Sequence, residues 1–209
     1  MKKILILILI FVGLFAVGCG GDKDSNDIKD TVKKVELLKD FALNFNDGSK
    51  IIINQKERKT TQNQNVIANS EEDNNDFLKD FTITSDKENM KILYIFTTWC
   101  EPCVGIFPHL ENLKKQFGDK ISFVGIPIDD IVGEVEDFSQ TLSVFTKEYN
   151  PPFPLALGDE RAKFINKIGA IKAVPLIVLY DKNGKYIIHY LGVIPEEMME
   201  FDISHNLSK

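Results

Sequence analysis

The sequence has few cysteines and no surplus of positive charge. Three cysteines among 209 residues are too few for a disulfide-stapled scaffold and for a metal site built from four thiolates. Lysine and arginine together number 25 against 31 acidic residues, so the formal net charge is −6. Without a basic surplus the chain is poorly suited to bind a phosphate backbone, and we expect no nucleic-acid partner.

Apolar residues are present in the proportion that a folded protein needs. Hydrophobic residues make up 44% of the chain and charged residues 27%. This balance supports a packed core and excludes a chain that is disordered throughout. The length allows one domain with appendages or at most two small domains.

The first residues have the pattern of an export signal. Two lysines precede an unbroken apolar run over residues 4–17, which is long enough for a signal-peptide core and short for a transmembrane helix. Small residues then precede Cys19, as in a bacterial lipobox, where the signal is cut before the cysteine and the thiol is lipidated. We therefore predict a lipoprotein signal peptide over residues 1–18. The exported protein would be anchored to a membrane through lipidated Cys19, facing the periplasm or another extracytoplasmic space.

Two alternatives to a lipid anchor remain at this end of the chain. The apolar run could stay as an uncleaved membrane anchor, or the protein could be secreted with Cys19 as a free thiol. All three interpretations carry the protein across the inner membrane.

Composition divides the next part of the chain into a tether and an extension. Residues 19–31 are small and polar, as expected of a flexible tether. Residues 32–90 form an N-terminal extension, in which alternating apolar residues around Asn46-Asp47-Gly48-Ser49 predict a β-hairpin. A polar insert over residues 54–76 follows the hairpin, and a short strand is expected at 81–84.

Residues 91–209 are predicted to form an α/β core. Apolar runs of strand length alternate with segments whose apolar residues recur at helical spacing. This order predicts a mixed central sheet flanked by helices on both faces. The expected strands cover 92–96, 121–128, 176–180 and 186–191, and the expected helices include 107–117, 135–145, 162–168 and the residues after Pro195.

The chemistry is expected at Trp99-Cys100-Glu101-Pro102-Cys103. Two cysteines separated by two residues can form a disulfide within one helical turn. The motif follows a buried strand and begins an amphipathic helix. Cys100 is therefore expected at a helix N-terminus, where unpaired N–H groups favour its thiolate, and Pro102 suits the first turn. We expect Cys100 to be the exposed nucleophile and Cys103, half-buried one turn later, to resolve the mixed disulfide.

Two structural roles for the cysteine pair are alternatives to redox chemistry. Half of a zinc site would need about two further ligands. Cys19 is assigned to the lipobox, His109 lies on the helix of the motif itself, and His189 and His205 show no paired ligand spacing, so we expect no metal. A purely structural disulfide would close so small a loop that it would constrain the unfolded chain little.

A second feature is Val174-Pro175, directly before a strongly apolar strand. A proline that enters a central strand is disfavoured unless it occupies a special position. A cis Val174-Pro175 bond would explain its place, although alone it could be an ordinary proline at the start of a strand. Together with the cysteine pair upstream, the sequence favours the cis bond.

These motifs together resemble the thioredoxin superfamily. The resemblance rests on the Trp-Cys-x-x-Cys sequence after a buried strand, on Pro108, on Val174-Pro175 and on the Asp181-x-x-Gly184 hairpin. The Cys-Glu-Pro-Cys sequence and the hairpin from Phe41 to Gly48 are similar to the ResA/TlpA branch of that superfamily. The resemblance covers roughly residues 35–207.

The resemblance implies a thioredoxin-like fold and the activity of a membrane-tethered extracytoplasmic thiol–disulfide oxidoreductase, often a reductase that serves cytochrome c maturation. It implies protein thiols and disulfides as substrates, a membrane protein as electron donor, and no cofactor beyond the redox-active disulfide. The catalytic pair would be Cys100 and Cys103. The residues that it places at the substrate are Trp99, Glu101, Pro102, Val174 and Pro175.

Three features depart from that pattern. Ile106 stands where members of the ResA branch often carry a glutamate, and Tyr94 stands where thioredoxins carry a buried aspartate. Such carboxylates help to deprotonate the resolving thiol. The polar insert over residues 54–76 is longer than the usual link between hairpin and core.

Two other classes on the same fold stay open. A peroxiredoxin-like peroxidase would place its cysteine after a Pro-x-x-x-Thr/Ser-x-x-Cys sequence, which does not precede Cys100. A copper-binding, metallochaperone-like module would add a histidine near the cysteine pair, and His189 is the candidate, although it lies in an expected strand.

Overall fold

The structure is a computed structural model that describes residues 40–56, 78–133, 135–169 and 171–208. The predicted signal peptide, the tether, Cys19 and most of the polar insert lie outside these residues. The strands are β1 (Asp40–Phe45), β2 (Lys50–Gln55), β3 (Phe81–Thr84), β4 (Met90–Phe96), β5 (Ile121–Pro127), β6 (Ala156–Leu157), β7 (Leu176–Tyr180) and β8 (Tyr186–Leu191). The helices are α1 (Glu101–Gly105), α2 (Phe107–Phe117), the 3-10 helix η2 (Gly118–Lys120), α3 (Asp129–Val132), α4 (Phe138–Tyr149), α5 (Asp159–Ile168) and α6 (Glu196–Leu207).

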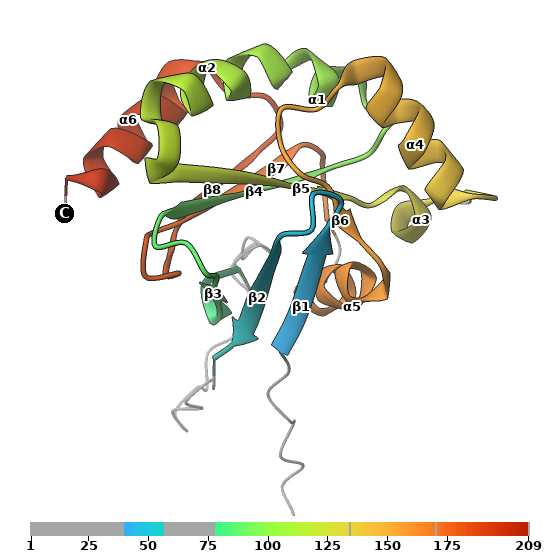
Figure 1. Cartoon of the computed structure of the whole chain (residues 1–209), viewed down its shortest axis with the longest axis horizontal. Coiled ribbons are helices and arrows are strands. Elements are labelled where there is room, and N and C mark those ends of the chain that lie inside the picture. Colours follow the sequence, from blue (N-terminus) through green and yellow to red (C-terminus); the bar gives the residue numbers. More distant parts are fainter. Residues whose placement is uncertain (1–39, 57–77, 134, 170, 209) are drawn as a thin grey trace, which may run out of the picture. The chain divides into compact units, whose positions relative to one another are not determined.

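A central sheet with the strand order β5-β4-β7-β8 positions the candidate site (Figure 1). β4 pairs with β5 in parallel and with β7 in an antiparallel arrangement, so the sheet is mixed, as predicted. Every residue of β4 is buried. Burial on both faces explains why residues 92–96 form a continuous apolar run rather than an alternating one.

The predicted N-terminal hairpin is confirmed and belongs to a second sheet, with the order β3-β2-β1-β6. β1 and β2 pair in an antiparallel arrangement, and at their turn Asp47 Oδ1 accepts a hydrogen bond from the backbone N–H of Ser49 (2.9 Å). The two-residue strand β6, which the sequence analysis did not predict, comes from the core and pairs with the other edge of β1. The hairpin is therefore joined to the core by backbone hydrogen bonds.

Apolar side chains form two clusters, one on each face of the central sheet. One face, which includes Ile92 and Phe96, packs against α2, α4 and α6. The other face, which includes Leu93 and Ile95, packs against α5 and the second sheet. Figure 1 shows α2, α4 and α6 above the central sheet and α5 below it. The mixed sheet with helices on both faces is thus confirmed, and α5 shares its face with the hairpin.

The cysteine motif was expected to begin the helix over 107–117, but the structure has two helices here, and the second has the predicted bounds. α1 ends at Gly105 and α2 begins at Phe107, with Ile106 between them. Pro108 has no N–H to donate to the carbonyl four residues earlier, so the ladder of helical hydrogen bonds is interrupted here. The short α1 therefore carries the cysteine motif, while α2 buries its apolar face in the core.

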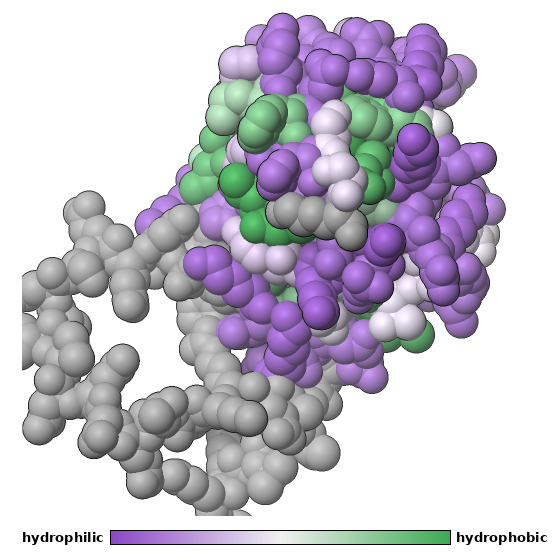
Figure 2. All heavy atoms as spheres, turned by 90° about the vertical axis from the view of Figure 1, so that its left-hand side faces the viewer, coloured by the Kyte–Doolittle hydropathy of each residue, from purple (hydrophilic) through white to green (hydrophobic). Residues whose placement is uncertain are grey.

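The described surface is mainly polar, with local apolar regions. In Figure 2, which shows the face on the left-hand side of Figure 1, hydrophilic residues cover much of the surface and apolar residues gather in the upper half. The C-terminal helix α6 exposes two large apolar side chains, Met198 and Phe201. Within the described ranges, no helix combines the length and the hydropathy that crossing a membrane requires.

Candidate active site

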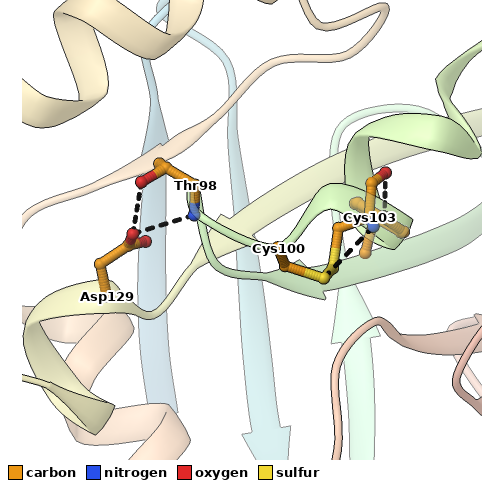
Figure 3. Close-up of a disulfide and its surroundings, with 5 residues drawn as sticks. Thr98, Cys100, Cys103 and Asp129 are labelled. Carbon is orange, nitrogen blue, oxygen red and sulfur yellow. Dashed lines mark hydrogen bonds between the residues drawn. A yellow bond between two sulfur atoms is a disulfide. The ribbon is translucent and has the colours of Figure 1, made fainter.

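The cysteine pair lies just beyond the end of β4 and forms a disulfide (Figure 3). Cys100 is the N-cap residue of α1, and its Sγ accepts a hydrogen bond from the backbone N–H of Cys103 (3.2 Å). Cys100 retains 6% exposure, whereas Cys103 is fully buried in the cluster beneath α2 and α4. The expectation of a half-buried Cys103 is therefore wrong, because the first turn of the helix directs its side chain into the core. The expectation of an exposed Cys100 is wrong as well, because the motif packs against the same cluster. Of the two cysteines, Cys100 is nevertheless the one that keeps some exposed surface, so a substrate can approach it.

The other three residues of the motif are exposed to solvent next to the disulfide. The side chain of Trp99 is 65% exposed, and Glu101 and Pro102 are exposed as well. Pro102 lies in the first turn of α1, as predicted. These three side chains thus border the surface at which a substrate disulfide would approach Cys100.

The Val174-Pro175 peptide bond is cis, as the sequence analysis expected. Leu176 pairs with Ile95 at the end of the antiparallel register of β4 and β7, and Pro175 directly precedes Leu176. Pro175 therefore lies at the same edge of the sheet as the loop that leads to Cys100. Val174 is partly buried and packs against the cluster that contains both cysteines.

A third segment reaches this edge, and the sequence analysis did not identify it. The backbone N–H of Gly192 donates a hydrogen bond to the carbonyl of Pro175 (2.8 Å). The next residue, Val193, is 56% exposed. The chain after β8 therefore borders the cis-proline turn and presents an apolar side chain there. The expected hairpin of these two strands could have identified this segment, because antiparallel pairing of β8 with β7 brings the end of β8 back to Pro175.

The side chains next to Cys103 are uncharged at the two positions where the resemblance would place carboxylates. Tyr94 is fully buried in β4, and its hydroxyl donates a hydrogen bond to the backbone carbonyl of Cys103 (2.7 Å). Burial raises the pKa of the Tyr94 hydroxyl far above its usual value, so the phenol stays protonated. Ile106 is also buried. Neither side chain can accept a proton from Cys103, so this proton must leave by another route.

A buried carboxylate holds the loop between β4 and the disulfide. Asp129 Oδ1 accepts hydrogen bonds from the backbone N–H (2.9 Å) and the hydroxyl (2.5 Å) of Thr98, as Figure 3 shows. Asp129 has no exposed surface, and its Oδ2 has no hydrogen-bond partner within the described part of the chain. Phe96 pairs with Pro127 in the parallel register, so two further residues on each chain bring Thr98 next to Asp129. The sequence analysis missed this contact because it depends on that register.

Replacing Asp129 with alanine should lower the free energy of unfolding by about 1–3 kcal/mol, since the backbone N–H of Thr98 would be left without its buried acceptor. Thr98→Val is the matched control, because it removes only the hydroxyl bond and should cost about 1 kcal/mol. Urea denaturation of both variants measures the two losses. Equal stability of Asp129→Ala and the unchanged protein would show that the carboxylate does not hold the loop.

The histidines do not meet at the cysteine pair. His109 Nδ1 lies 2.7 Å from Glu196, His189 Nδ1 lies 2.7 Å from the hydroxyl of Tyr186, and the ring of His205 stacks on Phe201. The hydrogen bond from His109 is the main cause that lowers the pKa of Glu196. Across residues 40–208, apart from the segments that are not described, no cluster of three histidine, cysteine or acidic side chains has the geometry to hold a metal ion.

Comparison with known proteins places the site in a recognised domain. The family profile described as Thioredoxin-like matches residues 88–186. A ResA thiol-disulfide oxidoreductase from Bacillus thuringiensis subsp. konkukian is 30% identical over 123 residues, which are 59% of this chain and 64% of that protein. The thioredoxin-like protein YneN from Bacillus subtilis is 26% identical over 116 residues, which are 55% of this chain and 64% of that protein. The chain thus spans less than two thirds of each of these relatives.

Solved structures share the fold over a larger part of the chain. A DsbE-type thiol:disulfide interchange protein from Chlorobium tepidum has a TM-score of 0.53 at 18% identity, covering 81% of this chain and 94% of that one. The pneumococcal exposed lipoprotein thioredoxin Etrx1 has a TM-score of 0.50 at 17% identity, covering 80% of this chain and 99% of that one. At such identities the likeness concerns fold alone, and it confirms the predicted architecture.

Proposed function

Because the chain contains a thioredoxin-like domain with a cysteine pair at one edge of its sheet, we propose that it is a thiol–disulfide oxidoreductase acting on protein thiols and disulfides. The observation that carries the proposal is the Cys100–Cys103 disulfide at the same sheet edge as the cis Pro175 turn. The ResA relatives, whose name states this activity, support it.

In the reductive direction, the thiolate of Cys100 attacks one sulfur of a substrate disulfide. A bond forms between Cys100 Sγ and that sulfur, and the other substrate sulfur leaves as a thiolate. Cys103, once deprotonated, then attacks Cys100 Sγ, which restores the Cys100–Cys103 disulfide and releases the second substrate thiolate. The substrate gains two electrons and the cysteine pair loses two. The N–H of Cys103, which already faces Cys100 Sγ, stabilises the attacking thiolate.

We also propose the direction of electron transfer and the location of the protein in the cell. The apolar run over residues 4–17 and the small residues before Cys19 support an exported protein that is held at a membrane by lipid on Cys19. Resemblance to the ResA/TlpA branch supports reduction, with electrons supplied by a membrane protein and with cytochrome c maturation as the candidate process. The pair itself carries the electrons, so the proposal needs no further cofactor.

A redox titration of the purified protein tests the proposal. We expect the Cys100–Cys103 pair to equilibrate with glutathione or dithiothreitol buffers at a midpoint near −270 mV, which is about the value of the reductant thioredoxin. The reduced protein should also reduce the disulfides of insulin. A midpoint near −120 mV would be about that of a strong oxidant and would reverse the proposed direction. A pair that exchanged with none of these partners would refute the activity.

A further inference from the structure

A groove of about 550 Å³ runs between the cysteine motif and α4. Trp99 borders it on the side of the disulfide, and Tyr149, at the end of α4, borders it further along. In Figure 1, α4 follows α1 on the same side of the central sheet. A polypeptide whose disulfide lies at Cys100 would therefore have this groove within reach of its flanking residues.

One face of α4 lines the groove along its length. Asp137, Val144 and Glu148 all border it, and these positions are seven and four residues apart, which places them on one side of a helix. Asp137 and Glu148 are eleven residues apart, which corresponds to about 16 Å along the helix axis. An extended segment of about five residues has the same length. The groove thus fits a short stretch of extended polypeptide.

The groove carries negative charge without a compensating cation. Glu136, Asp137 and Glu148 border it, whereas the described residues that line it include no lysine, arginine or histidine. The one lysine of α4, Lys147, lies with the residues of a separate depression instead. Of the two charged side chains within α4, Glu148 therefore borders the groove and Lys147 does not.

Glu101, between the two cysteines, adds to this charge. The pKa of Tyr149 is raised, chiefly by its hydrogen bond to Glu148 and by the charge of Glu148, and the charge of Glu101 contributes as well. Glu101 is exposed and lies two residues after Trp99, which borders the groove. The cysteine motif therefore adds a carboxyl group to the acidic side chains of the groove.

Two exposed aromatic side chains border the groove beside its carboxylates. Trp99 is 65% exposed and Tyr149 is 43% exposed. A lysine or arginine side chain can place its charge over an aromatic face while it pairs with a nearby carboxylate. Exposed aromatic rings next to carboxylates are therefore suited to cationic side chains and unsuited to anionic ones.

We propose that this groove binds the segment of substrate polypeptide next to the reactive disulfide and selects substrates that carry lysine or arginine in that segment. The proposal rests on the proposed oxidoreductase function and names its substrate class. Charge complementarity speeds the encounter and opposes acidic partners, so selectivity should appear mainly in kcat/KM.

Three matched peptide disulfides test the selectivity. They differ only in having two lysines, two glutamines or two glutamates within three residues of the cysteine, and their rates with dithiothreitol correct for intrinsic reactivity. Each exposed ion pair is worth about a 1.4- to fivefold change, so the peptide with two lysines should have a kcat/KM roughly fivefold above the glutamine peptide. The advantage should shrink as sodium chloride is raised, because salt screens exposed charges.

A charge-reversal variant assigns the selectivity to the groove. Glu136→Lys/Glu148→Lys should lose the preference for the lysine peptide or reverse it. The control, Asp86→Lys/Glu88→Lys, makes the same change in net charge on exposed residues of the turn before β4, at the opposite end of that strand from Trp99. The control should keep the preference of the unchanged protein.

The outcomes separate the two proposals. Equal corrected rates for the three peptides, with all of them reduced, would overturn the groove assignment and leave the oxidoreductase function standing. A preference that persisted in Glu136→Lys/Glu148→Lys would also overturn it. Failure to reduce any peptide would refute the oxidoreductase function itself.

Discussion

Replacing Cys103 with serine should produce a protein that accumulates mixed disulfides with its substrates through Cys100, whereas Cys100→Ser should accumulate almost none. Cys100 retains some exposed surface, and its Sγ accepts a hydrogen bond from the backbone N–H of Cys103, while Cys103 is fully buried. Without Cys103, nothing attacks the mixed disulfide from inside the protein, so the intermediate persists. Catalytic turnover should be lost in both variants. The accumulation of mixed disulfides is therefore the measurement that distinguishes the role of Cys100 from that of Cys103.

Alkylation of each single-cysteine variant across pH measures the same asymmetry. A hydrogen bond to its sulfur should hold the pKa of Cys100 below the free-thiol value of about 8.5, and burial should raise the pKa of Cys103 above it. At neutral pH, Cys100 in the Cys103→Ser variant should therefore react more than about tenfold faster than Cys103 in the Cys100→Ser variant. A faster reaction at Cys103 would reverse the assigned roles.

Local patterns in the sequence were sufficient to predict most of the fold. The strands at 176–180 and 186–191 have the predicted bounds, because an apolar run, a turn of Asp and Gly, and a second run specify a hairpin locally. The cysteine motif was located for a similar reason, since its spacing and its place after a buried strand are both visible in the sequence. The cis bond before Pro175 was predicted from two motifs taken together.

The features that were missed depend on contacts between distant segments. β6 has two residues and is defined by pairing with β1, and Leu155 N donates to Asn46 Oδ1 across 109 positions of sequence. Asp129 is a buried acid whose role follows from the register of β4 and β5. The break at Ile106 is different, because Pro108 is visible in the sequence. The cysteine motif was nevertheless expected to begin the same helix that continues over residues 107–117.

Gly184 makes a contact between the two sheets that its turn sequence does not reveal. Its φ is +73°, and its carbonyl accepts a hydrogen bond from the backbone N–H of Ile83 in β3 (2.9 Å). A Cβ at this position would lie 1.8 Å from the carbonyl oxygen of Ile83. The turn between β7 and β8 is therefore pressed against the backbone of β3, where no flexible side chain can move aside.

Gly184→Ala should destabilise the protein by about 2–5 kcal/mol, which combines about 1–2 kcal/mol for the left-handed backbone with about 1–3 kcal/mol for the loss of a buried hydrogen bond as β3 moves away. Gly48→Ala is the matched control, because Gly48 also has a positive φ of +83° but a Cβ there would meet nothing within 4 Å. The control should therefore lose only the backbone contribution, about 1–2 kcal/mol. Urea denaturation of both variants measures the difference. Equal losses would mean that the turn can move away from β3 without cost, and that β3 is held to the core by its other contacts alone.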